Sequence, residues 1–526
     1  MGRKIQRKFV CFEQKTRRTR FAKKELDLIF YKNLKKHKKT SQKDIVFSIF
    51  ANGVVSNQDD LISKPNECKE FYNLSVSDGS LKTGLGFRDL QVPASADDLE
   101  TCHGFDFAEK IDEIDGIWLD RWYNTDVEMY IYTLLMIDSE FVVWGVPLID
   151  QYEGIVWSKS NKLSSYPTYE CQYRIENTDC TLFFSEEGML YLAAYGEGIY
   201  PDVPALISGV VHYDNFFGIT NTNRNTLIYT TNLNLKEWSD EESSAIEFLD
   251  NRGSFNKLVA FNDYVYLFRE YGITKISIYT SKDDFSFTHL YTSSSKIYEN
   301  SVCVCGDKVF FMTRDGLYTF NGTSVNKVAE AYDKYFKKLN NTNCSSACLN
   351  GKYYIATKCN FDDGEQIGCE GKTAFVNNVL FEVDIENFAL NVYRGVDIRK
   401  ILTVDNPYMS KLCACFYYDH KQQIGELTVD GKTFTDINKK MWKSFETDLD
   451  YKSKKKKIKE VIINTLYDCE VEIKSDEETK TYSFSGSEKE QRLPVCVYGK
   501  NFQFSFSTTA QNCEICKPMI VFDVVS

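Results

Sequence analysis

The sequence predicts an all-β chain whose largest part is a six- or seven-bladed β-propeller. Three observations support this fold: a phrase that recurs after forty-four residues, a high aromatic content, and short strand-like runs separated by Asn, Asp and Gly turns. A period in the low to mid forties with about four short strands per unit is typical of a propeller blade. One blade cannot cover both faces of its own sheet, so a repeat of this kind implies an array.

The clearest copies of the phrase occupy residues 261–273 and 305–317. Each contains a short turn, an aromatic-rich strand, a charged turn ending in Gly and the start of another strand. Related phrases occur at 182–192, 212–219 and 349–356. About 320 residues separate positions 116 and 435, and division by a period of 44–50 predicts six or seven blades.

A chain of 526 residues is too long for one ordinary core, which predicts two or more domains. The 33 Tyr and 37 Phe favour strands over helices. We assign residues 46–435 to the propeller, with one internal helix at Val328–Leu339. Residues 436–526 show strict alternation of apolar and polar positions, as at Phe502, Phe504 and Phe506. This alternation predicts a C-terminal antiparallel β-sandwich, and without a flexible linker we expect it to pack tightly on the propeller.

Residues 1–45 are predicted to be a basic N-terminal arm that contains a short helix within 21–36. Residues 1–44 contain sixteen Lys or Arg and four Asp or Glu, a balance of +12, so the rest of the chain carries −24. Such an arm seeks an anionic surface that the acidic body avoids. A protein neighbour, nucleic acid and a solubilising tail all remain open. The candidate contact residues are Arg3, Lys4, Arg7, Lys8, Arg17, Arg18, Arg20, Lys23 and Lys24.

Cysteine usage and hydropathy favour a protein made and folded in a cytosol. The seventeen cysteines are odd in number and irregularly spaced, and the basic N-terminus lacks the apolar core of a secretory signal. We therefore expect reduced, mostly buried thiols. Cys513 and Cys516 have zinc-knuckle spacing but no second pair nearby, so no metal site is expected. No apolar run approaches the ~18 residues of a membrane span.

The sequence contains no catalytic template: it lacks a Gly-x-Ser-x-Gly elbow, a phosphate loop, a dinucleotide fingerprint and a His-Glu-x-x-His helix. Residues 279–287 are similar to the Asp-box turn of sialidase propellers, but Phe285 replaces the Gly of that turn. Other carboxylates lie at predicted turns or in an acidic stretch without calcium-loop spacing, and we expect them to be solvated. We expect neither an enzyme nor a cofactor. These carboxylates are Glu186, Glu187, Glu270 and Asp315 at turns, and Glu109, Asp112, Glu113, Asp115 and Asp120 in the stretch.

Three stretches resemble a known family of tailed-bacteriophage proteins. The first is 68–86, with an Asn-bearing strand followed by a Gly-containing one. The second is 227–238 together with 271–277, and the third is the ending from Trp442 through 492–502. Together they resemble the β-propeller structural proteins of phage necks and tails, in particular the head-to-tail stabilisation (tail hub) proteins of podovirus-type phages. The resemblance covers about residues 46–526, and the basic arm lies outside it.

The resemblance implies a non-enzymatic virion protein, made in the host bacterial cytoplasm and assembled as a homo-oligomeric ring around the DNA channel beneath the portal. Its partners would be the portal and other neck or tail proteins, with possible non-specific DNA contact through the arm. Two alternatives stay open. A glycan- or receptor-binding tail protein predicts an aromatic pocket on one propeller face, and a propeller glycosidase predicts a pair of catalytic carboxylates.

Overall fold

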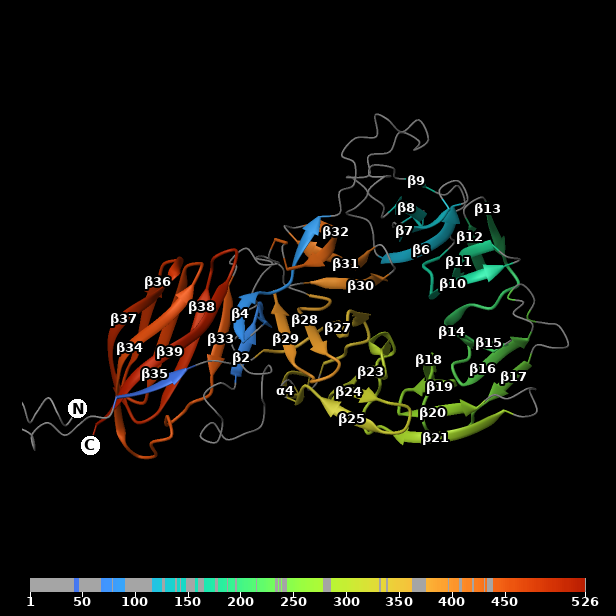
Figure 1. Ribbon diagram of the computed structural model, residues 1–526. Helices are drawn as coiled ribbons and strands as arrows, with labels where there is room; N and C mark the ends of the chain where they lie inside the picture. The colour runs from blue at the N-terminus through green and yellow to red at the C-terminus, as the bar shows by residue number, and fades with distance from the viewer. Residues whose placement is uncertain are drawn as a thin grey trace, which may run out of the picture.

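The computed structural model describes residues 42–46, 68–89, 116–147, 157–158 and 165–525, apart from short gaps inside these ranges, the longest at 278–284, 362–374 and 433–438. This part of the chain is mainly β-structure and forms nine antiparallel sheets. Seven of them form a ring and two form a sandwich beside it (Figure 1). The prediction of an all-β propeller with a C-terminal sandwich is therefore confirmed.

Six of the seven ring sheets each take four consecutive strands. The first three sheets contain β6 (Gly116–Asn124), β7 (Met129–Ile137), β8 (Val143–Pro147) and β9 (Trp157–Ser158); β10 (Tyr169–Ile175), β11 (Thr178–Ser185), β12 (Gly188–Ala193) and β13 (Gly196–Tyr200); β14 (Leu206–His212), β15 (Asn215–Thr220), β16 (Thr226–Thr231) and β17 (Ser244–Glu247). The next three contain β18 (Phe255–Phe261), β19 (Tyr264–Arg269), β20 (Gly272–Ser277) and β21 (Ser286–Thr292); β22 (Cys303–Cys305), β23 (Lys308–Thr313), β24 (Gly316–Phe320) and β25 (Val325–Val328); β26 (Ser345–Leu349), β27 (Lys352–Thr357), β28 (Val379–Asp384) and β29 (Leu390–Arg394).

The seventh blade closes the ring with a strand from the beginning of the chain. It contains β30 (Ile398–Asp405), β31 (Ser410–Tyr418), β32 (Lys421–Thr428) and, at its outer edge, β5 (Gly86–Asp89). Phe87 of β5 pairs with Leu427 and lies fully buried. On the other side, β30 packs against β6 of the first blade. The last blade is therefore completed by a strand that precedes the first blade in the sequence.

The repeated phrases occupy equivalent positions in successive blades. In blade four, Asn262 and Asp263 join β18 to β19 with positive φ angles of 46° and 61°. Blade five uses Gly306 at φ 57°, and blade six uses Asn350 at φ 51°. Asn, Asp and Gly tolerate this left-handed backbone, which matches the twist of a two-residue hairpin. The repeat therefore reports the first hairpin of each blade.

Aromatic side chains fill the spaces between neighbouring blades. Phe268 of blade four meets Phe311 of blade five with ring centroids 5.6 Å apart. Phe310 then stacks on Tyr353 of blade six at 4.7 Å. All four rings are buried, and burying each one stabilises the fold by roughly 1.5–3 kcal/mol. The alternation of Phe310 and Phe311 across β23 thus binds one sheet to both of its neighbours.

Two sheets form the sandwich, and each combines strands from both ends of the chain. The six-stranded sheet contains β3 (Leu74–Ser77), β4 (Ser80–Thr83), β39 (Glu514–Val525), β34 (Lys455–Thr465), β37 (Ser487–Gly499) and, paired with β39, β1 (Gln42–Val46). The five-stranded sheet contains β2 (Cys68–Tyr72), β33 (Lys440–Ser444), β38 (Phe502–Thr508), β35 (Cys469–Ser475) and β36 (Thr479–Phe484). Trp442 and Phe504 lie in the core between them.

The strand pairing differs from the predicted boundaries at two places. Strand β1 begins inside the predicted arm, and β2, β3 and β4 belong to the sandwich although residues 46–435 were assigned to the propeller. The structure does form a hairpin of β3 and β4 within the resembling stretch 68–86, but local alternation does not reveal which distant strand a hairpin will join. The internal helix is also shorter than predicted. Among the described residues this helix comprises α4 (Asp333–Phe336), because Val328 still belongs to strand β25. A separate 3-10 turn, η5 (Glu299–Ser301), precedes β22.

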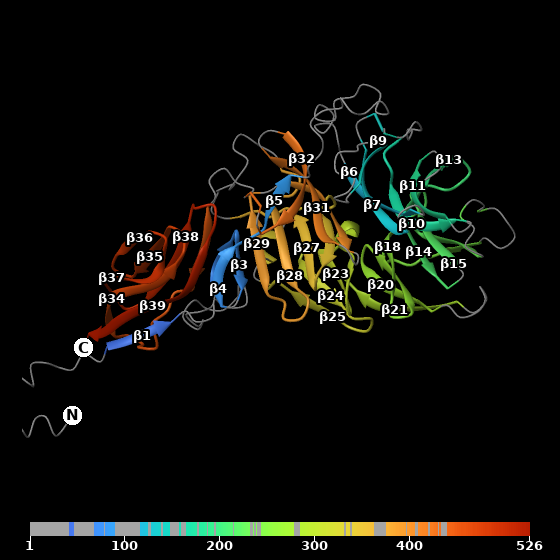
Figure 2. The same cartoon turned by 45° about the horizontal axis from the view of Figure 1, so that its top comes forward.

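Asn73 connects the sandwich directly to blade six. Its N–H donates to the carbonyl oxygen of Val392 at 2.7 Å, and its Oδ1 accepts the N–H of Arg394 at 2.8 Å. Its Nδ2 donates to the carbonyl oxygen of Lys439 at 3.0 Å, beside β33. Strands β3 and β4 accordingly lie between the C-terminal strands and β29 (Figure 2). The predicted tight packing of sandwich on propeller is confirmed.

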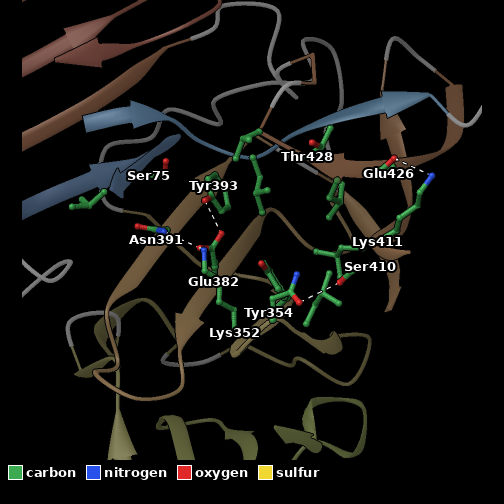
Figure 3. Close-up of a pocket in the computed structure, with 17 residues that line it drawn as sticks. Ser75, Lys352, Tyr354, Glu382, Asn391, Tyr393, Ser410, Lys411, Glu426 and Thr428 are labelled. Atoms are coloured by element: carbon green, nitrogen blue, oxygen red, sulfur yellow. Dashed lines mark hydrogen bonds and ion pairs between the residues drawn. The ribbon is translucent and has the colours of Figure 1, made fainter. Parts of the chain in front are cut away.

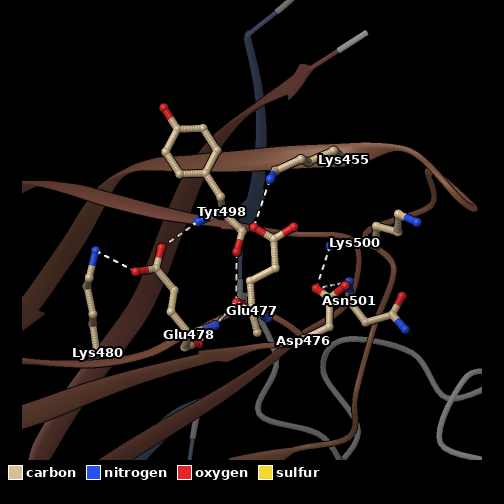
Figure 4. A network of polar contacts seen from close by, with 9 residues as sticks. Lys455, Asp476, Glu477, Glu478, Lys480, Tyr498, Lys500 and Asn501 are labelled. Carbon is tan, nitrogen blue, oxygen red and sulfur yellow. Dashed lines mark hydrogen bonds and ion pairs between the residues drawn. The ribbon is translucent and has the colours of Figure 1, made fainter.

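The outer edge of β37 is covered by the turn between β35 and β36 (Figure 4). Glu478 accepts the N–H of Tyr498 at 2.9 Å, and Lys480 donates to the carbonyl oxygen of Cys496 at 2.6 Å. Asp476 accepts the N–H of Lys500 at 2.6 Å. An edge strand with unpaired backbone groups invites another strand to pair with it, and these side chains prevent that. This end of β37 is therefore closed to strand addition.

Candidate functional site

A pocket of about 460 Å³ lies where blades six and seven meet strand β3 of the sandwich (Figure 3). Its walls come from β26–β29, from β31 and β32, and from β3. Pockets at domain junctions are common binding sites. The polar side chains that line it are Ser75, Asn350, Lys352, Tyr354, Glu382, Asn391, Tyr393, Ser410, Lys411, Glu426 and Thr428.

Glu382 is the most buried carboxylate of the pocket, with 4% of its side chain exposed. Lys352 and Asn391 both donate to Oε1, the latter at 3.0 Å, and the Tyr393 hydroxyl donates to Oε2 at 2.9 Å. Burial, and secondarily the negative Glu382, raises the pKa of Tyr393 well above its ordinary value. Tyr393 therefore remains a donor, and Glu382 is a fully hydrogen-bonded structural carboxylate.

The opposite wall of the pocket also pairs its charges. Lys411 lies 3.6 Å from Glu426, and the Ser410 hydroxyl donates to Oδ1 of Asn350 at 3.2 Å. Burial raises the pKa of Tyr354, with Glu382 as a second cause, so this phenol also stays protonated. The pocket thus presents hydroxyl and amide groups beside compensated charges. Such a surface suits binding of a polar ligand better than proton transfer.

Sequence reasoning missed this pocket because its residues meet through long-range pairing. Tyr354 faces Glu382 across β27 and β28, and Glu382 faces Asn391 across β28 and β29. The available signal was Glu382 between the apolar residues Phe381 and Val383, since a charged residue in such a strand usually has a partner. Identifying that partner requires the register of the sheet.

A second group of charges gathers on the first strands of the blades, which lie closest to the propeller axis (Figure 1). Lys400 of β30 places its Nζ 4.0 Å from the ring centroid of Trp118 on β6. Burial raises the pKa of Glu170 on β10 to about 7, although Lys400 opposes this shift and Asp120 adds to it. Burial lowers the pKa of Lys400 to about 8, and Lys257 on β18 lowers it further. Shifts of this size gather at functional sites more often than elsewhere.

Asp120 corrects one sequence-based expectation. It was taken as part of a solvated acidic stretch, but it is 6% exposed and accepts a hydrogen bond from the Thr181 hydroxyl of the next blade. Gln172 donates to Thr181 Oγ1 at 2.6 Å and to the carbonyl oxygen of Leu119 at 2.7 Å. Asp120 therefore links blades one and two. The other acidic residues of the stretch, Glu109 to Asp115, lie outside the described residues.

The turn carboxylates do not form a catalytic pair among the described residues. Glu270 makes an ion pair with Lys296 at 2.7 Å, and Asp315 accepts the Ser295 hydroxyl. Glu186 is exposed at the β11–β12 turn. Glu187, residues 279–284 of the Asp-box-like segment and all nine candidate contact residues of the arm lie outside the described residues. Their roles stay predictions.

The cysteines of the described part of the chain are thiols, without a disulfide partner. All cysteines there are free and most are buried, as expected for reduced thiols. Burial raises the pKa of Cys513 to about 12. No cluster of three or more His, Cys, Asp or Glu in this part is arranged to hold a metal ion. None of its helices has the length and hydropathy of a membrane span.

No family model and no curated protein matches the chain. Among solved structures it is similar to the extracellular domain of the putative one-component system BT4673 from B. thetaiotaomicron, at 10% identity and a TM-score of 0.39, over 82% of this chain and 59% of that one. It is also similar to Raptor from Chaetomium thermophilum (7%, TM-score 0.39, 56% of this chain and 26% of that one) and to BamB from Moraxella catarrhalis (11%, TM-score 0.33, 56% and 91%). TM-scores this low carry no argument about function.

Proposed function

We propose that this chain is a structural protein of the head-to-tail junction or tail of a tailed bacteriophage, where it binds neighbouring virion subunits in a ring. The proposal takes its biological setting from the three stretches that resemble tail hub proteins. The structural observation that supports the proposal is the direct connection between the two domains. Residues 68–83 build the sandwich, and Gly86–Asp89 closes the propeller immediately afterwards.

This arrangement supports a scaffold because the chain passes directly from a sandwich strand into a propeller strand, which leaves the two domains little freedom to move apart. Only residues 84 and 85 lie between β4 and β5, and Asn73 hydrogen-bonds to β29 on the propeller side. A subunit that transmits load between a capsid and a tail needs such stiffness. Glu382 in the pocket and Asp120 on the first strand of blade one both accept hydrogen bonds from other side chains of the protein. Carboxylates held in this way favour a binding role over bond cleavage.

In this proposal the basic arm binds an anionic neighbour. Residues 1–44 carry +12 and the rest of the chain −24, so the arm of one subunit is attracted to the body of another as well as to DNA. Phosphate contacts release counterions and weaken steeply with salt, whereas an apolar protein interface does not. The salt dependence of binding by the arm therefore distinguishes a DNA partner from a protein partner that offers an apolar interface.

The test is deletion of residues 1–41, which leaves strand β1 intact. We expect that the truncated protein is missing from the junction of the particles, or that the particles lose DNA. The purified truncated protein should keep the unfolding transition of the full chain. A control variant replaces only the nine candidate Lys and Arg residues with Gln, and it should reproduce the defect if charge is the cause. Fully assembled, DNA-retaining particles with the deletion would refute the role of the arm.

One observation favours glycan or receptor binding as a second candidate function. Tyr123 and Tyr130 lie at the β6–β7 turn with ring centroids 5.2 Å apart, and they are 44% and 37% exposed. Exposed aromatic faces are what a sugar ring or an apolar receptor surface packs on. Screening the protein on a glycan array tests this function, and Tyr130→Ala should abolish any signal. Binding that persists in that variant would place the glycan elsewhere.

A further inference from the structure

The wall that blade six contributes to the pocket at the domain junction is polar (Figure 3). Tyr354 of β27 lies directly opposite Glu382 of β28, and Glu382 lies opposite Asn391 of β29. Residues opposite one another in paired strands project from the same face of the sheet. Blade six therefore presents three neighbouring polar side chains to the pocket.

Blade seven faces these side chains with leucines. Leu412 of β31 pairs with Leu427 of β32, so both project from one face of the sheet. They belong to the same buried cluster as Tyr354, which places this face against blade six. Lys411 and Glu426, the next residues along the two strands, form an ion pair with each other at the side of the pocket (Figure 3). The pocket thus has one polar wall and one largely apolar wall.

The Tyr354 hydroxyl is available to a ligand. Tyr354 is 6% exposed, and among the described residues its hydroxyl has no hydrogen-bond partner. The side chain lines the pocket between Glu382 and Ser410, and its oxygen is open to the pocket (Figure 3). A buried polar group without a partner lowers stability, and a ligand that hydrogen-bonds to it removes this cost.

The amides on either side of Tyr354 have complementary spare groups. Asn391 donates its Nδ2 to Glu382 and keeps Oδ1 as an acceptor. Asn350 accepts the Ser410 hydroxyl at Oδ1 and keeps Nδ2 as a donor. Both lysines of the pocket are paired with glutamates, so the pocket has no net charge. It therefore offers an acceptor, a hydroxyl and a donor to a neutral ligand.

We propose that this pocket binds the pyranose ring of a neutral sugar. The hydroxyl groups of the ring, each both donor and acceptor, face Tyr354 and the two amides, and its C–H face packs on Leu412 and Leu427. A charged ligand would bring a charge without a partner into the pocket. The volume of about 460 Å³ lies in the range of about 300–1,000 Å³ that is typical of small-molecule sites. This site is separate from Tyr123 and Tyr130 and does not depend on the proposed role in assembly.

The sandwich closes one side of the pocket, so a bound sugar contacts both domains. Ser75 and Val76 of β3 line the pocket, and the Ser75 hydroxyl donates to the carbonyl oxygen of Thr83 at 2.9 Å. A ligand that binds only the folded state suppresses opening of the segments it contacts. Hydrogen exchange of the wild type should therefore slow on binding in residues 75–76, 349–354 and 410–412. Slowing only in other parts of the chain would overturn the proposal.

The test is saturation-transfer difference NMR of the full chain with the methyl glycosides of glucose, galactose, mannose and N-acetylglucosamine. A ligand of about thirteen non-hydrogen atoms with ordinary ligand efficiency has a Kd on the order of 1 mM. We expect at least one of these sugars to bind in this range. Its uronic-acid and amino-sugar counterparts should bind at least about fivefold more weakly, because each brings an unpaired charge. Absence of binding by all four neutral sugars, or tighter binding of a charged counterpart, would overturn the proposal.

Tyr354→Phe removes only the hydroxyl and should weaken sugar binding about fivefold, the effect of one ordinary hydrogen bond. The variant should unfold like the wild type, since this hydroxyl has no partner in the described part of the protein. The matched control is Tyr229→Phe, because Tyr229 is 3% exposed but lies on β16 in blade three, and this variant should bind like the wild type. Undiminished binding by Tyr354→Phe would refute the proposal. Binding lost instead in Tyr130→Ala would also refute it and place the sugar on blade one.

Discussion

Replacing Asn73 tests the physical link between the two domains. Asn73 has a φ of 60°, and its side chain bonds the backbone of Arg394 in the propeller and of Lys439 beside the sandwich. Asn73→Ala removes two hydrogen bonds worth about 1 kcal/mol each. Alanine in the left-handed region costs about 1 kcal/mol more. We therefore expect a loss of about 3 kcal/mol for Ala and about 2 kcal/mol for Asn73→Gly, which adopts this backbone freely.

Urea unfolding followed by tryptophan fluorescence measures these differences, and hydrogen exchange locates them. The amide proton of Arg394 should exchange faster in both variants. Asn73→Asp keeps the oxygen that accepts this proton, so it should preserve the protection. Asn262 also has a positive φ, 46°, but it lies in the β18–β19 turn, far along the chain from the junction. Asn262→Ala should therefore be less stable than Asn262→Gly while leaving Arg394 protected. If Asn73→Ala matched the wild type in stability and exchange, the junction would not depend on Asn73.

Three further predictions concern ring closure and buried charge. In Gly86→Ala the new Cβ would lie 2.1 Å from a backbone oxygen, so β5 must shift, and the free energy of unfolding should fall by at least about 2 kcal/mol. In the control Gly198→Ala the new Cβ meets only an ordinary contact at 3.4 Å, so this variant should unfold like the wild type. Asp250 lies 2.6 Å from the buried Arg269, whose hydrogen bond holds the pKa of Asp250 far below its ordinary value. Asp250→Asn should lower the free energy of unfolding by about 2 kcal/mol at pH 7, less than for a fully buried pair because Asp250 is 35% exposed. This difference from the wild type should disappear as pH falls through the depressed pKa of Asp250. A difference that does not change with pH would refute the ion pair. The folded-state pKa of Glu170 is raised to about 7, so the stability that the protonated carboxyl contributes is complete below its ordinary pKa of 4.5 and is lost as pH rises to 7. In urea unfolding, Glu170→Gln should match the stability of the wild type at pH 4 and exceed it by up to about 3 kcal/mol at pH 8. Equal stability of the two proteins at both pH values would contradict this prediction.

The propeller could be predicted because its signals are local. Each first hairpin needs residues that accept a positive φ, so Asn262, Gly306 and Asn350 recur at the spacing of the blades. Buried aromatic strands between these turns, such as Lys308–Thr313, reinforce the pattern. Neither signal depends on which blade comes next, so both are visible in the sequence alone.

The N-terminal strands could not be assigned in this way. Strand β2 pairs with β33, β4 with β39, and β5 with β32, partners that lie more than 300 residues away in the chain. A short hairpin has the same alternation whether it joins a blade or a sandwich. The resembling stretch 68–86 did contain the decisive residues. Asn73 needs its positive φ, and at Gly84 an added Cβ would lie 2.5 Å from the Tyr393 ring.

The candidate sites depended on tertiary structure even more strongly. Leu412 and Leu427 look like ordinary strand leucines in the sequence, and only the packing of blade seven on blade six brings them to Tyr354. Glu382 likewise meets Asn391 and Tyr393 only through the register of β28 with β29. The nine basic residues of the arm, from Arg3 to Lys24, stay a prediction of charge alone.

The sequence by itself determined the repeating hairpin, the alternating sandwich strands and the division between a basic arm and an acidic body. These features follow from backbone preferences and charge, which act over a few residues. Only the tertiary structure decided that the first strands of the chain complete the last sheets, and where half-buried charges meet. Both outcomes depend on contacts between distant segments, whose free energy appears only after the chain has folded.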